Sequence, residues 1–401
     1  MISVEEALSR LLEPLEPLPP EQISLADGLG RVLAEDVAAR RTQPPFAVSA
    51  MDGYAVRAED LAKIPVELRI VAEVPAGAGF GGHVGAGEAA RIFTGGVMPS
   101  GADTVVIQEH TRRLDGRVLV EKPTENGRNV RRRGLDFAEG APLLRRGQRL
   151  SARDVALAAA MNHPAVPVHR RPKVAVLATG DELVMPGSTP GAAQIVYSNG
   201  FATMAMAEHE GCEVVDLGIA PDRLAETAAA IRRARARGAD ILVTSGGASV
   251  GDHDLVQRAL GEEGLTLSFW KIAMRPGRPM LHGRLGAMHV LGLPGNPVSA
   301  FVCSFLFLVP LIRALMGRTD IERTPEPAVL GSDLPANDER ADYLRATLEP
   351  GPGGSQVATP HPLQDSSMLA PLAAADCLLV REPHAPAARA GSPCSILKLG
   401  I

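Results

Sequence analysis

Acidic side chains stand beside glycine-rich and basic segments at several places in this sequence. Asp181 and Glu182 follow an apolar run in ATGDEL, Asp252 lies in TSGGASVGDHD, Asp52 in SAMDGYA and Asp136 in NVRRRGLD. In proteins, Mg²⁺ is commonly bound by one or two carboxylates together with oxygens of a phosphate-bearing substrate. The pattern therefore indicates metal-assisted chemistry on a phosphate compound. The alternative for each carboxylate is a helix cap or a solvated position.

Two loops have the composition of anion-binding turns. Gly246 and Gly247 in TSGGASVGD allow backbone N–H groups to approach a ligand closely. In LPGNPVSA, Asn296 suits the N-cap and Pro297 the first position of a helix, whose free N–H groups attract anions. No G-K-[ST] follows the glycines, so a standard ATP-binding loop is not predicted. A tight turn and simple helix capping remain the alternatives.

Basic residues concentrate in the segment FWKIAMRPGRP. On a strand, Lys271 and Arg275 would share one face, because side chains alternate with a period of two. Pro276 and Gly277 favour a turn that presents Arg275 and Arg278 together, which suits a tetrahedral oxyanion or phosphate. We therefore expect Arg275→Ala to weaken oxyanion binding more than Arg278→Ala. The alternative is an exposed turn with solvated charges, and the arginines of NVRRRGLD carry the same alternative.

The elements that must position these loops lie mainly in residues 173–320, where apolar strands alternate with helices. Strands are predicted in KVAVLATG, EVVDLGI, DILVTSGG, LSFWKIAM, PMLHGRL and MHVLGLPG, and two intervening helices should stop at Gly211 and Gly238. This alternation predicts a doubly wound α/β domain with a mainly parallel sheet. Ligands of such sheets bind beyond the carboxyl ends of the strands. The loops of ATGDEL, TSGGASVGDHD and LPGNPVSA should therefore line one rim.

The segments before and after residues 173–320 have different sequence patterns. Residues 1–40 are expected to be helical with an interruption at EPLEPLPPEQ, and a helix over 151–162 should be capped by Ser151. Short apolar runs separated by glycine and proline between Pro44 and Val120 predict a β-rich domain with hairpins. Short strands and turns over 326–401 predict a C-terminal β-barrel or sandwich. The chain is therefore expected to contain several domains.

The overall composition disfavours several functional classes. The formal net charge is -5 and aromatic residues make up 3%, so nucleic-acid binding is not predicted. The four cysteines form no C-x-x-C pair, so neither structural zinc nor a disulfide framework is predicted. The first residues lack the pattern of a signal peptide, and the apolar run 301–312 is too short to span a bilayer. We expect a soluble, cytoplasmic protein that does not bind membranes.

Seven segments, in family order, resemble the molybdopterin molybdenumtransferase family, whose eukaryotic relative is the gephyrin E domain. They are PPFAVSAMDGYA (44–55), IFTGGVMPSGADTVVIQE (92–109), NVRRRGLD (129–136), ATGDEL (178–183), TSGGASVGDHD (244–254), FWKIAMRPGRP (269–279) and LPGNPVSA (293–300). Residues 326–401 match more loosely. Each segment alone is a weak signal, whereas their combination and order are specific.

The resemblance implies an α/β plus β fold and an elongated homodimer of four-domain subunits. A discontinuous helical linker domain would comprise residues 1–43 and 137–172, and a β-rich domain residues 44–136. The molybdopterin-binding α/β domain would comprise residues 173–325, and the β-barrel residues 326–401. The active site would lie between the α/β domain of one subunit and the β-rich domain of the other.

The activity implied by the resemblance is insertion of molybdate into adenylylated molybdopterin, with release of AMP and with Mg²⁺ as the assisting metal. The implied catalytic residues are Asp52, Asp136, Asp181, Glu182 and Lys271, and the implied metal ligands are Asp181, Glu182 and Asp252. The implied substrate-binding residues are Thr94, Ser245, Gly246, Gly247, Asp252, Arg275, Pro276, Arg278, Asn296, Pro297, Arg345 and Ser366. The family usually carries lysines where this chain has Arg275 and Arg278. At each position a planar, forked guanidinium group therefore replaces the point charge of an ammonium group.

Two other functions remain open from the sequence. A molybdopterin adenylyltransferase shares the α/β domain but would not need residues 1–172, and a non-catalytic, gephyrin-like scaffold would not need the acidic motifs. Molybdate and tungstate have nearly equal size and charge, so the sequence does not choose between them. The only further protein partners that the sequence points to are other enzymes of molybdenum cofactor synthesis.

Overall fold

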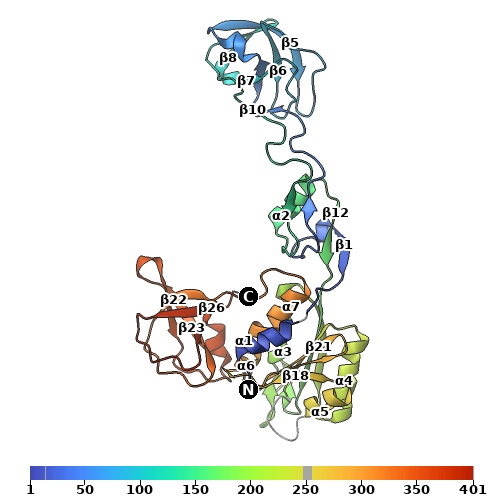
Figure 1. The fold of residues 1–401 in the computed structure, drawn as a ribbon, viewed down its shortest axis with the longest axis vertical. Coiled ribbons are helices and arrows are strands. Elements are labelled where there is room, and N and C mark those ends of the chain that lie inside the picture. The colour runs from blue at the N-terminus through green and yellow to red at the C-terminus, as the bar shows by residue number, and fades with distance from the viewer. Residues whose placement is uncertain (14, 247–254, 401) are drawn as a thin grey trace.

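The computed structural model describes residues 1–13, 15–246 and 255–400, and its outline is extended and bent (Figure 1). A β-rich unit stands at one end and is joined through a narrow linker unit to an α/β unit, beside which lies a β-barrel. Both termini lie near the junction of the α/β unit and the barrel. The predicted multidomain architecture of α/β plus β type is confirmed.

The α/β unit is built on a six-stranded mixed sheet in the order β16-β13-β17-β21-β20-β18. The first four strands of this order are parallel neighbours, whereas β20 and β18 join antiparallel at one edge. Most residues of the central strands are buried, as expected when helices cover both faces. The strands are β13 (Lys173–Thr179), β16 (Glu213–Ala220), β17 (Ile241–Ser245), β18 (Thr266–Trp270), β20 (Leu281–Leu285) and β21 (Met288–Leu293).

Helices pack on both faces of this sheet, which confirms the predicted doubly wound arrangement. One apolar core lies under α3 (Asn199–Glu210), α6 (Pro297–Cys303) and α7 (Val309–Leu315), and the other under α4 (Leu224–Ala236) and α5 (Leu255–Glu262). A π-helical turn, Ser304–Leu308, joins α6 to α7. The continuous helix Pro297–Leu315 is long and apolar enough to cross a membrane, but it is 94% buried within the fold, as a core helix would be.

The amino-terminal segment differs from the expectation that residues 1–40 are mainly helical. Among its described residues the α-helical part is α1 (Val4–Leu12), and the chain continues into β1 (Pro20–Ser24) and β2 (Val37–Ala38). Prolines lack the N–H that a helix needs, and they are frequent in this connection. Ala7 and Leu11 are buried in the core shared with α7, so α1 packs on the α/β unit rather than on the linker to which residues 1–43 were assigned.

The linker unit consists of small antiparallel pairs and one helix. β1 pairs with β12 (Ala165–His169), and β2 pairs with β11 (Pro142–Leu144). α2 (Ala152–Ala160) begins at the predicted cap, because the Ser151 side chain accepts a hydrogen bond from the Asp154 amide. The chain passes from the linker unit into the β-rich unit and later returns, so two segments connect these units. At the start of the β-rich unit, β3 (Val48–Ser49) pairs with β10 (Val130–Arg131).

The β-rich unit contains a second six-stranded sheet, in the order β7-β4-β6-β5-β9-β8. Its two small apolar cores lie on opposite faces of this sheet, and β8 and β9 form one of the expected hairpins. The strands are β4 (Gly53–Val56), β5 (Val66–Val74), β6 (Glu88–Ile92), β7 (Thr104–Ile107), β8 (Thr111–Leu114) and β9 (Arg117–Val120).

The carboxyl-terminal unit is a closed β-barrel, because β25 pairs with both β26 and β23. A short strand of the α/β unit, β19 (Met274–Arg275), adds in parallel to β23 and so joins the two units by backbone hydrogen bonds. The barrel strands are β22 (Glu326–Leu330), β23 (Ala341–Pro350), β24 (Gln356–Pro360), β25 (Cys377–Arg381) and β26 (Pro393–Lys398), and a short helix, α8 (Leu369–Ala373), precedes β25.

Candidate functional site

Three strand ends meet at one rim of the α/β sheet, as the sequence predicted. Ala178 of β13 pairs with Ser245 of β17, and Ser245 pairs with Leu293 of β21. The loops that follow these strands are ATGDEL, TSGGASVGDHD and LPGNPVSA, so all three start side by side. Such a rim is where ligands of open α/β sheets bind.

A pocket of about 350 Å³ opens at this rim. It contains Glu182, Ser245, Gly246, Asn296 and Pro297, which are five of the residues predicted to act on the substrate. Gly247 and Asp252 were predicted for the same place and lie outside the described residues. The remaining lining comprises Thr179, Leu183, Ile195, Val196, Tyr197, Ser198, Asn199, Gly295, Ser367 and Leu369.

Gly246 has a conformation and a close contact that other residues would not tolerate. Its φ is 92°, in the left-handed region, and a Cβ atom built on it would lie 2.5 Å from the carbonyl oxygen of Thr179. The backbone at the end of β17 therefore approaches the end of β13 more closely than a side chain allows. This explains the glycine in structural terms and leaves the Gly246 backbone facing the pocket.

Asn296 and Ser366 connect the α/β unit to the carboxyl-terminal unit at this pocket. Asn296 occupies the predicted N-cap of α6 and Pro297 its first position, but the Asn296 side chain makes no capping bond. Its Nδ2 instead donates to Ser366 Oγ at 2.9 Å, and the Val298 amide donates to the Ser366 carbonyl at 3.0 Å. The loose sequence match at Ser366 thus coincides with a direct contact to the pocket.

Arg345 is placed beneath this contact rather than in the pocket. Its side chain is almost completely buried, with 1% of the residue exposed. Its guanidinium donates to Gln364 Oε1 at 3.2 Å and to the carbonyl oxygens of Met368 and Leu363 at 3.0 and 3.2 Å. Arg345 therefore holds the loop that carries Ser366, which is a positioning contact.

The two carboxylates of ATGDEL occupy different environments. Both are exposed, but Glu182 lines the pocket, whereas the Asp181 Oδ1 accepts a hydrogen bond from the Asp222 amide at 3.1 Å. Within residues 1–13, 15–246 and 255–400, no group of three or more His, Cys, Asp or Glu side chains could hold a metal. Carboxylate oxygens such as those of Glu182 and Asp181 are the ligand type that Mg²⁺ prefers.

The expected pairing of Lys271 and Arg275 on one strand face is wrong. β18 ends at Trp270, and Lys271 has a left-handed φ of 70°, which breaks the alternation. The Lys271 ammonium lies over the Trp270 ring, 3.9 Å from its centroid. Arg275 belongs to β19 and pairs with the barrel strand β23. The physical basis for expecting a larger effect of Arg275→Ala than of Arg278→Ala on oxyanion binding is therefore lost.

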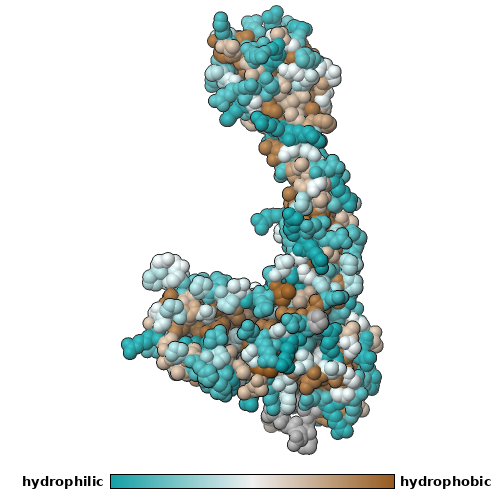
Figure 2. Space-filling view, in the orientation of Figure 1, coloured by the Kyte–Doolittle hydropathy of each residue, from teal (hydrophilic) through white to brown (hydrophobic). Residues whose placement is uncertain are grey.

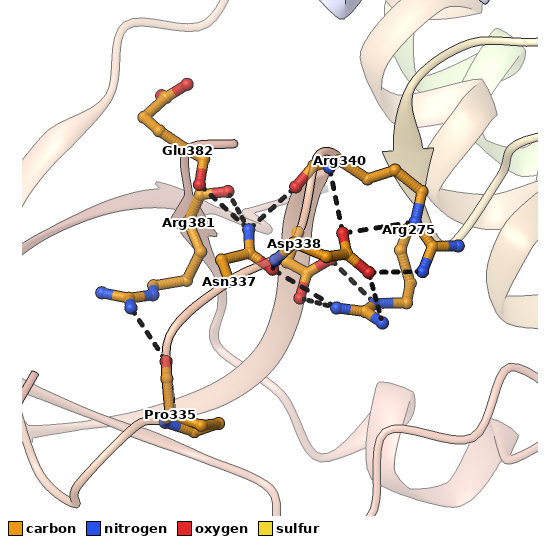
Figure 3. Close-up of polar contacts among 8 residues, drawn as sticks. Arg275, Pro335, Asn337, Asp338, Arg340, Arg381 and Glu382 are labelled. Carbon is orange, nitrogen blue, oxygen red and sulfur yellow. Dashed lines mark hydrogen bonds and ion pairs between the residues drawn. The ribbon is translucent and has the colours of Figure 1, made fainter. Parts of the chain in front are cut away.

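Arg275 is held by acidic side chains of the barrel unit (Figure 3). Its Nε and Nη2 donate to the two carboxylate oxygens of Asp342 at 2.8 and 2.6 Å, and Nη1 lies 3.4 Å from Asp338 Oδ2. The hydrogen bond to Asp342 raises the pKa of Arg275, while the bond from Arg340 lowers the pKa of Asp338 to about 2. Arg278 is exposed and forms no side-chain hydrogen bond or ion pair with the described part of the chain.

The β-rich unit, which carries Asp52 and Thr94, stands at the opposite end of the molecule from the α/β unit with this pocket (Figure 1). Asp52 Oδ1 accepts hydrogen bonds from Thr94 N at 2.7 Å and Thr94 Oγ1 at 2.8 Å, and these bonds lower the pKa of Asp52. Asp136 is exposed in the turn before the linker, where its amide donates to the Gln43 carbonyl. The structure joins Asp52 to Thr94 and separates both from Glu182 within one chain.

Residues from the end of β15 (Ile195–Val196) into the first turn of α3 also shape the pocket and were missed from the sequence. Burial raises the pKa of Tyr197 to about 12, and a Cβ on Gly200 would lie 1.5 Å from the Tyr197 hydroxyl. Asn199 Nδ2 donates to the Gly295 carbonyl at 2.8 Å and so ties the start of α3 to the loop after β21. The polar run YSNG before a helix was the available signal.

Comparisons with known proteins agree along the whole chain. Family models match residues 2–162 as the MoeA N-terminal region (domain I and II), 175–314 as a probable molybdopterin binding domain, and 327–399 as the MoeA C-terminal region (domain IV). The molybdopterin molybdenumtransferase of Haemophilus influenzae is 34% identical over 99% of this chain and 98% of its own length. The enzyme of the same name from a Nostoc species is 41% identical over 74% of this chain and 70% of its own length.

A solved structure shows the same architecture. The molybdopterin biosynthesis MoeA protein of Pyrococcus horikosii superposes with a TM-score of 0.85 at 32% identity, covering 99% of both chains. The agreement extends over all four units rather than over the α/β unit alone. The chain described here therefore belongs to the MoeA family, whose curated relatives named above are molybdopterin molybdenumtransferases.

Proposed function

We propose that this chain inserts molybdate into adenylylated molybdopterin and releases AMP, as a transferase of molybdenum cofactor biosynthesis. The observation that carries the proposal is the pocket at the three strand ends, in a chain that matches named molybdenumtransferases over nearly its full length. An adenylyltransferase would need only the α/β unit, whereas the family match here includes the β-rich unit and the barrel.

The described residues suggest a division of roles in the pocket. The Gly246 backbone can approach a phosphate group closely, because it lines the pocket without a side chain. The first turn of α6 offers less, since Pro297 has no N–H and the Val298 amide already donates to the Ser366 carbonyl. Asn296 and Ser366 provide neutral hydrogen-bonding groups beside that turn. Glu182, with Asp181, would hold Mg²⁺, which when bound supplies charge neutralisation at the phosphate oxygens.

We further propose that two copies of the chain share each active site. Two hydrogen bonds from Thr94 hold Asp52 and lower its pKa, yet its β-rich unit stands at the other end of the molecule from the α/β unit that carries Glu182 (Figure 1). A second copy could bring its β-rich unit to the pocket of the first. In this arrangement Asp52 and Asp136 act on a substrate held by the other subunit. A cytoplasmic location and contact with enzymes that supply the adenylylated pterin accompany this proposal.

The test is an assay of AMP release from adenylylated molybdopterin and molybdate with the purified chain. Glu182→Gln and Asp52→Asn should each lower the rate by at least about a hundredfold, which is the size of effect seen when one group that stabilises transition-state charge is removed. Asp115→Asn, an exposed carboxylate in the turn between β8 and β9, is the matched control and should keep full activity. Full activity of Glu182→Gln would contradict the proposed site.

Mixing the two inactive variants tests the sharing of sites. A mixed dimer of Glu182→Gln and Asp52→Asn would contain one site with neither substitution, so activity should return when the two proteins are refolded or expressed together. No recovery in a preparation shown to contain mixed dimers would argue that each chain uses its own Asp52.

A further inference from the structure

A second pocket lies at the hinge between the linker and the β-rich unit. It has a volume of about 500 Å³ and is lined by Arg40, Arg41, Thr42, Phe46, Arg133 and Glu139, among others. The chain crosses between the linker unit and the β-rich unit twice. Arg40 and Arg41 lie in the first of these two crossings and Arg133 in the second. An antiparallel β-bridge between Gln43 and Phe137 joins the two crossings. Side chains from both connections therefore surround one space.

Among the residues that the structure describes, the arginines of this hinge pocket have no acidic partner. Arg133 Nε donates to the Pro45 carbonyl at 3.1 Å, and none of Arg40, Arg41 and Arg133 forms an ion pair with the residues that the structure describes. Many other arginines of the chain form ion pairs. Arg145, for example, directly follows β11 in the linker unit and pairs with Asp36. Three exposed arginines and one carboxylate, Glu139, line the pocket in a protein whose net charge is -5. An external anion bound there would accept charge-assisted hydrogen bonds from the guanidinium groups.

An aromatic ring lies beside these cations. Phe46 is 61% exposed, although burial of a phenylalanine is favourable, and it follows two prolines that restrict the backbone. Figure 2 shows hydrophilic surface next to hydrophobic surface where the β-rich unit narrows into the hinge. Forked guanidinium groups suit a phosphate, and an exposed ring suits a flat heterocycle.

We propose that the hinge pocket binds a nucleoside monophosphate, with the phosphate on Arg40, Arg41 and Arg133 and the base on Phe46. The choice of AMP among such ligands rests on the proposed function, in which AMP is the product. Because the pocket is built from both crossings, a ligand bound there would fix the β-rich unit relative to the linker and thereby orient Asp52.

Hydrogen exchange of the full chain, measured by mass spectrometry with AMP as the probe, tests this site. AMP should slow exchange in peptides from both crossings, 38–48 and 131–141, and adenosine, which lacks the phosphate, should not. The double variant Arg40→Ala/Arg41→Ala should raise the AMP concentration needed for this protection by at least about tenfold, since two charge-assisted contacts are removed. The matched control, Arg146→Ala/Arg153→Ala, removes two exposed linker arginines outside the pocket and should leave it unchanged.

Two further arms separate the phosphate from the base and this site from the proposed function. Phe46→Ala should weaken protection by AMP while leaving protection by inorganic pyrophosphate unchanged. Absence of protection at both crossings, or equal protection in Arg40→Ala/Arg41→Ala, would overturn the proposal, and an equal AMP response in Phe46→Ala would overturn the nucleoside assignment. These readouts do not depend on molybdenum insertion, so failure of the hinge site and failure of the proposed activity are distinguishable.

Discussion

The junction between the α/β unit and the barrel should depend on Arg275. Its guanidinium makes a two-bond contact with Asp342, whose side chain is 10% exposed, while the Arg275 side chain is 48% exposed. Removing one partner of a fully buried pair costs about 3–5 kcal/mol, and an exposed pair contributes about 0–1 kcal/mol. Arg275→Ala leaves a nearly buried carboxylate in a place that water can partly reach. We therefore expect a loss of about 2 kcal/mol in the free energy of unfolding.

Urea unfolding followed by tryptophan fluorescence measures this loss. The chain has one tryptophan, Trp270, at the end of β18 and near the start of the segment that forms β19, so the signal reports the relevant unit. With a slope of about 2 kcal/mol per molar urea, the midpoint should fall by roughly 1 M. Arg278→Ala is the control, because its side chain is exposed and has no partner in the described residues, and its effect should stay within about 0.5 kcal/mol.

A double variant separates the ion pair from other effects. In Arg275→Ala/Asp342→Asn the unpaired carboxylate is gone, so part of the lost stability should return and the two substitutions should not add. Equal midpoints for Arg275→Ala and Arg278→Ala would refute the reasoning, because the Asp342 contact would then contribute nothing measurable.

Two other predictions concern the sheet. Gly246→Ala should lower the free energy of unfolding by about 1–3 kcal/mol, because φ is 92° and the new Cβ would lie 2.5 Å from the Thr179 carbonyl oxygen. Gly261→Ala in helix α5 is the control and should be neutral or stabilising when both variants are unfolded in the same denaturant series. Burial lowers the pKa of His282 to about 4 and of His289 to about 3, while the unfolded chain takes up these protons below about pH 6.5. Between pH 6.5 and these lower folded-state pKa values, the unfolded chain therefore binds more protons than the folded chain. The free energy of unfolding should fall as the pH drops from 6.5 toward 4. His282→Leu/His289→Leu should show a smaller fall over that interval, and an unchanged pH slope would argue against the buried pair as its source.

Several features of the fold followed from local sequence. Continuous apolar runs marked the central strands of the α/β sheet, because both faces of those strands are covered. Gly211 ends α3 in a left-handed conformation and Ser151 caps α2, and each is a local property of the backbone. The convergence of three strand-end loops was also predictable, since parallel strands of one sheet end at the same rim.

Other features could not be predicted because they depend on distant partners. The apolar face of α1 identified a helix but not the unit on which it packs. Alternation along FWKIAMRPGRP suggested one strand face, yet the left-handed Lys271 divides the segment between two sheets. Asn296 had the right type for a cap, and a loop 70 residues away takes its side chain instead.

The sequence alone thus determined the order of the units, the strand and helix types in the α/β unit and the residues at its rim. Only the tertiary structure decided which charges are engaged: Arg275 with Asp342 at 67 residues' separation, Arg345 beneath Ser366, and the hinge arginines with no acidic partner among the described residues. Strand and helix types and caps follow largely from neighbours along the chain, whereas the partner of a charged side chain is set by which elements pack together.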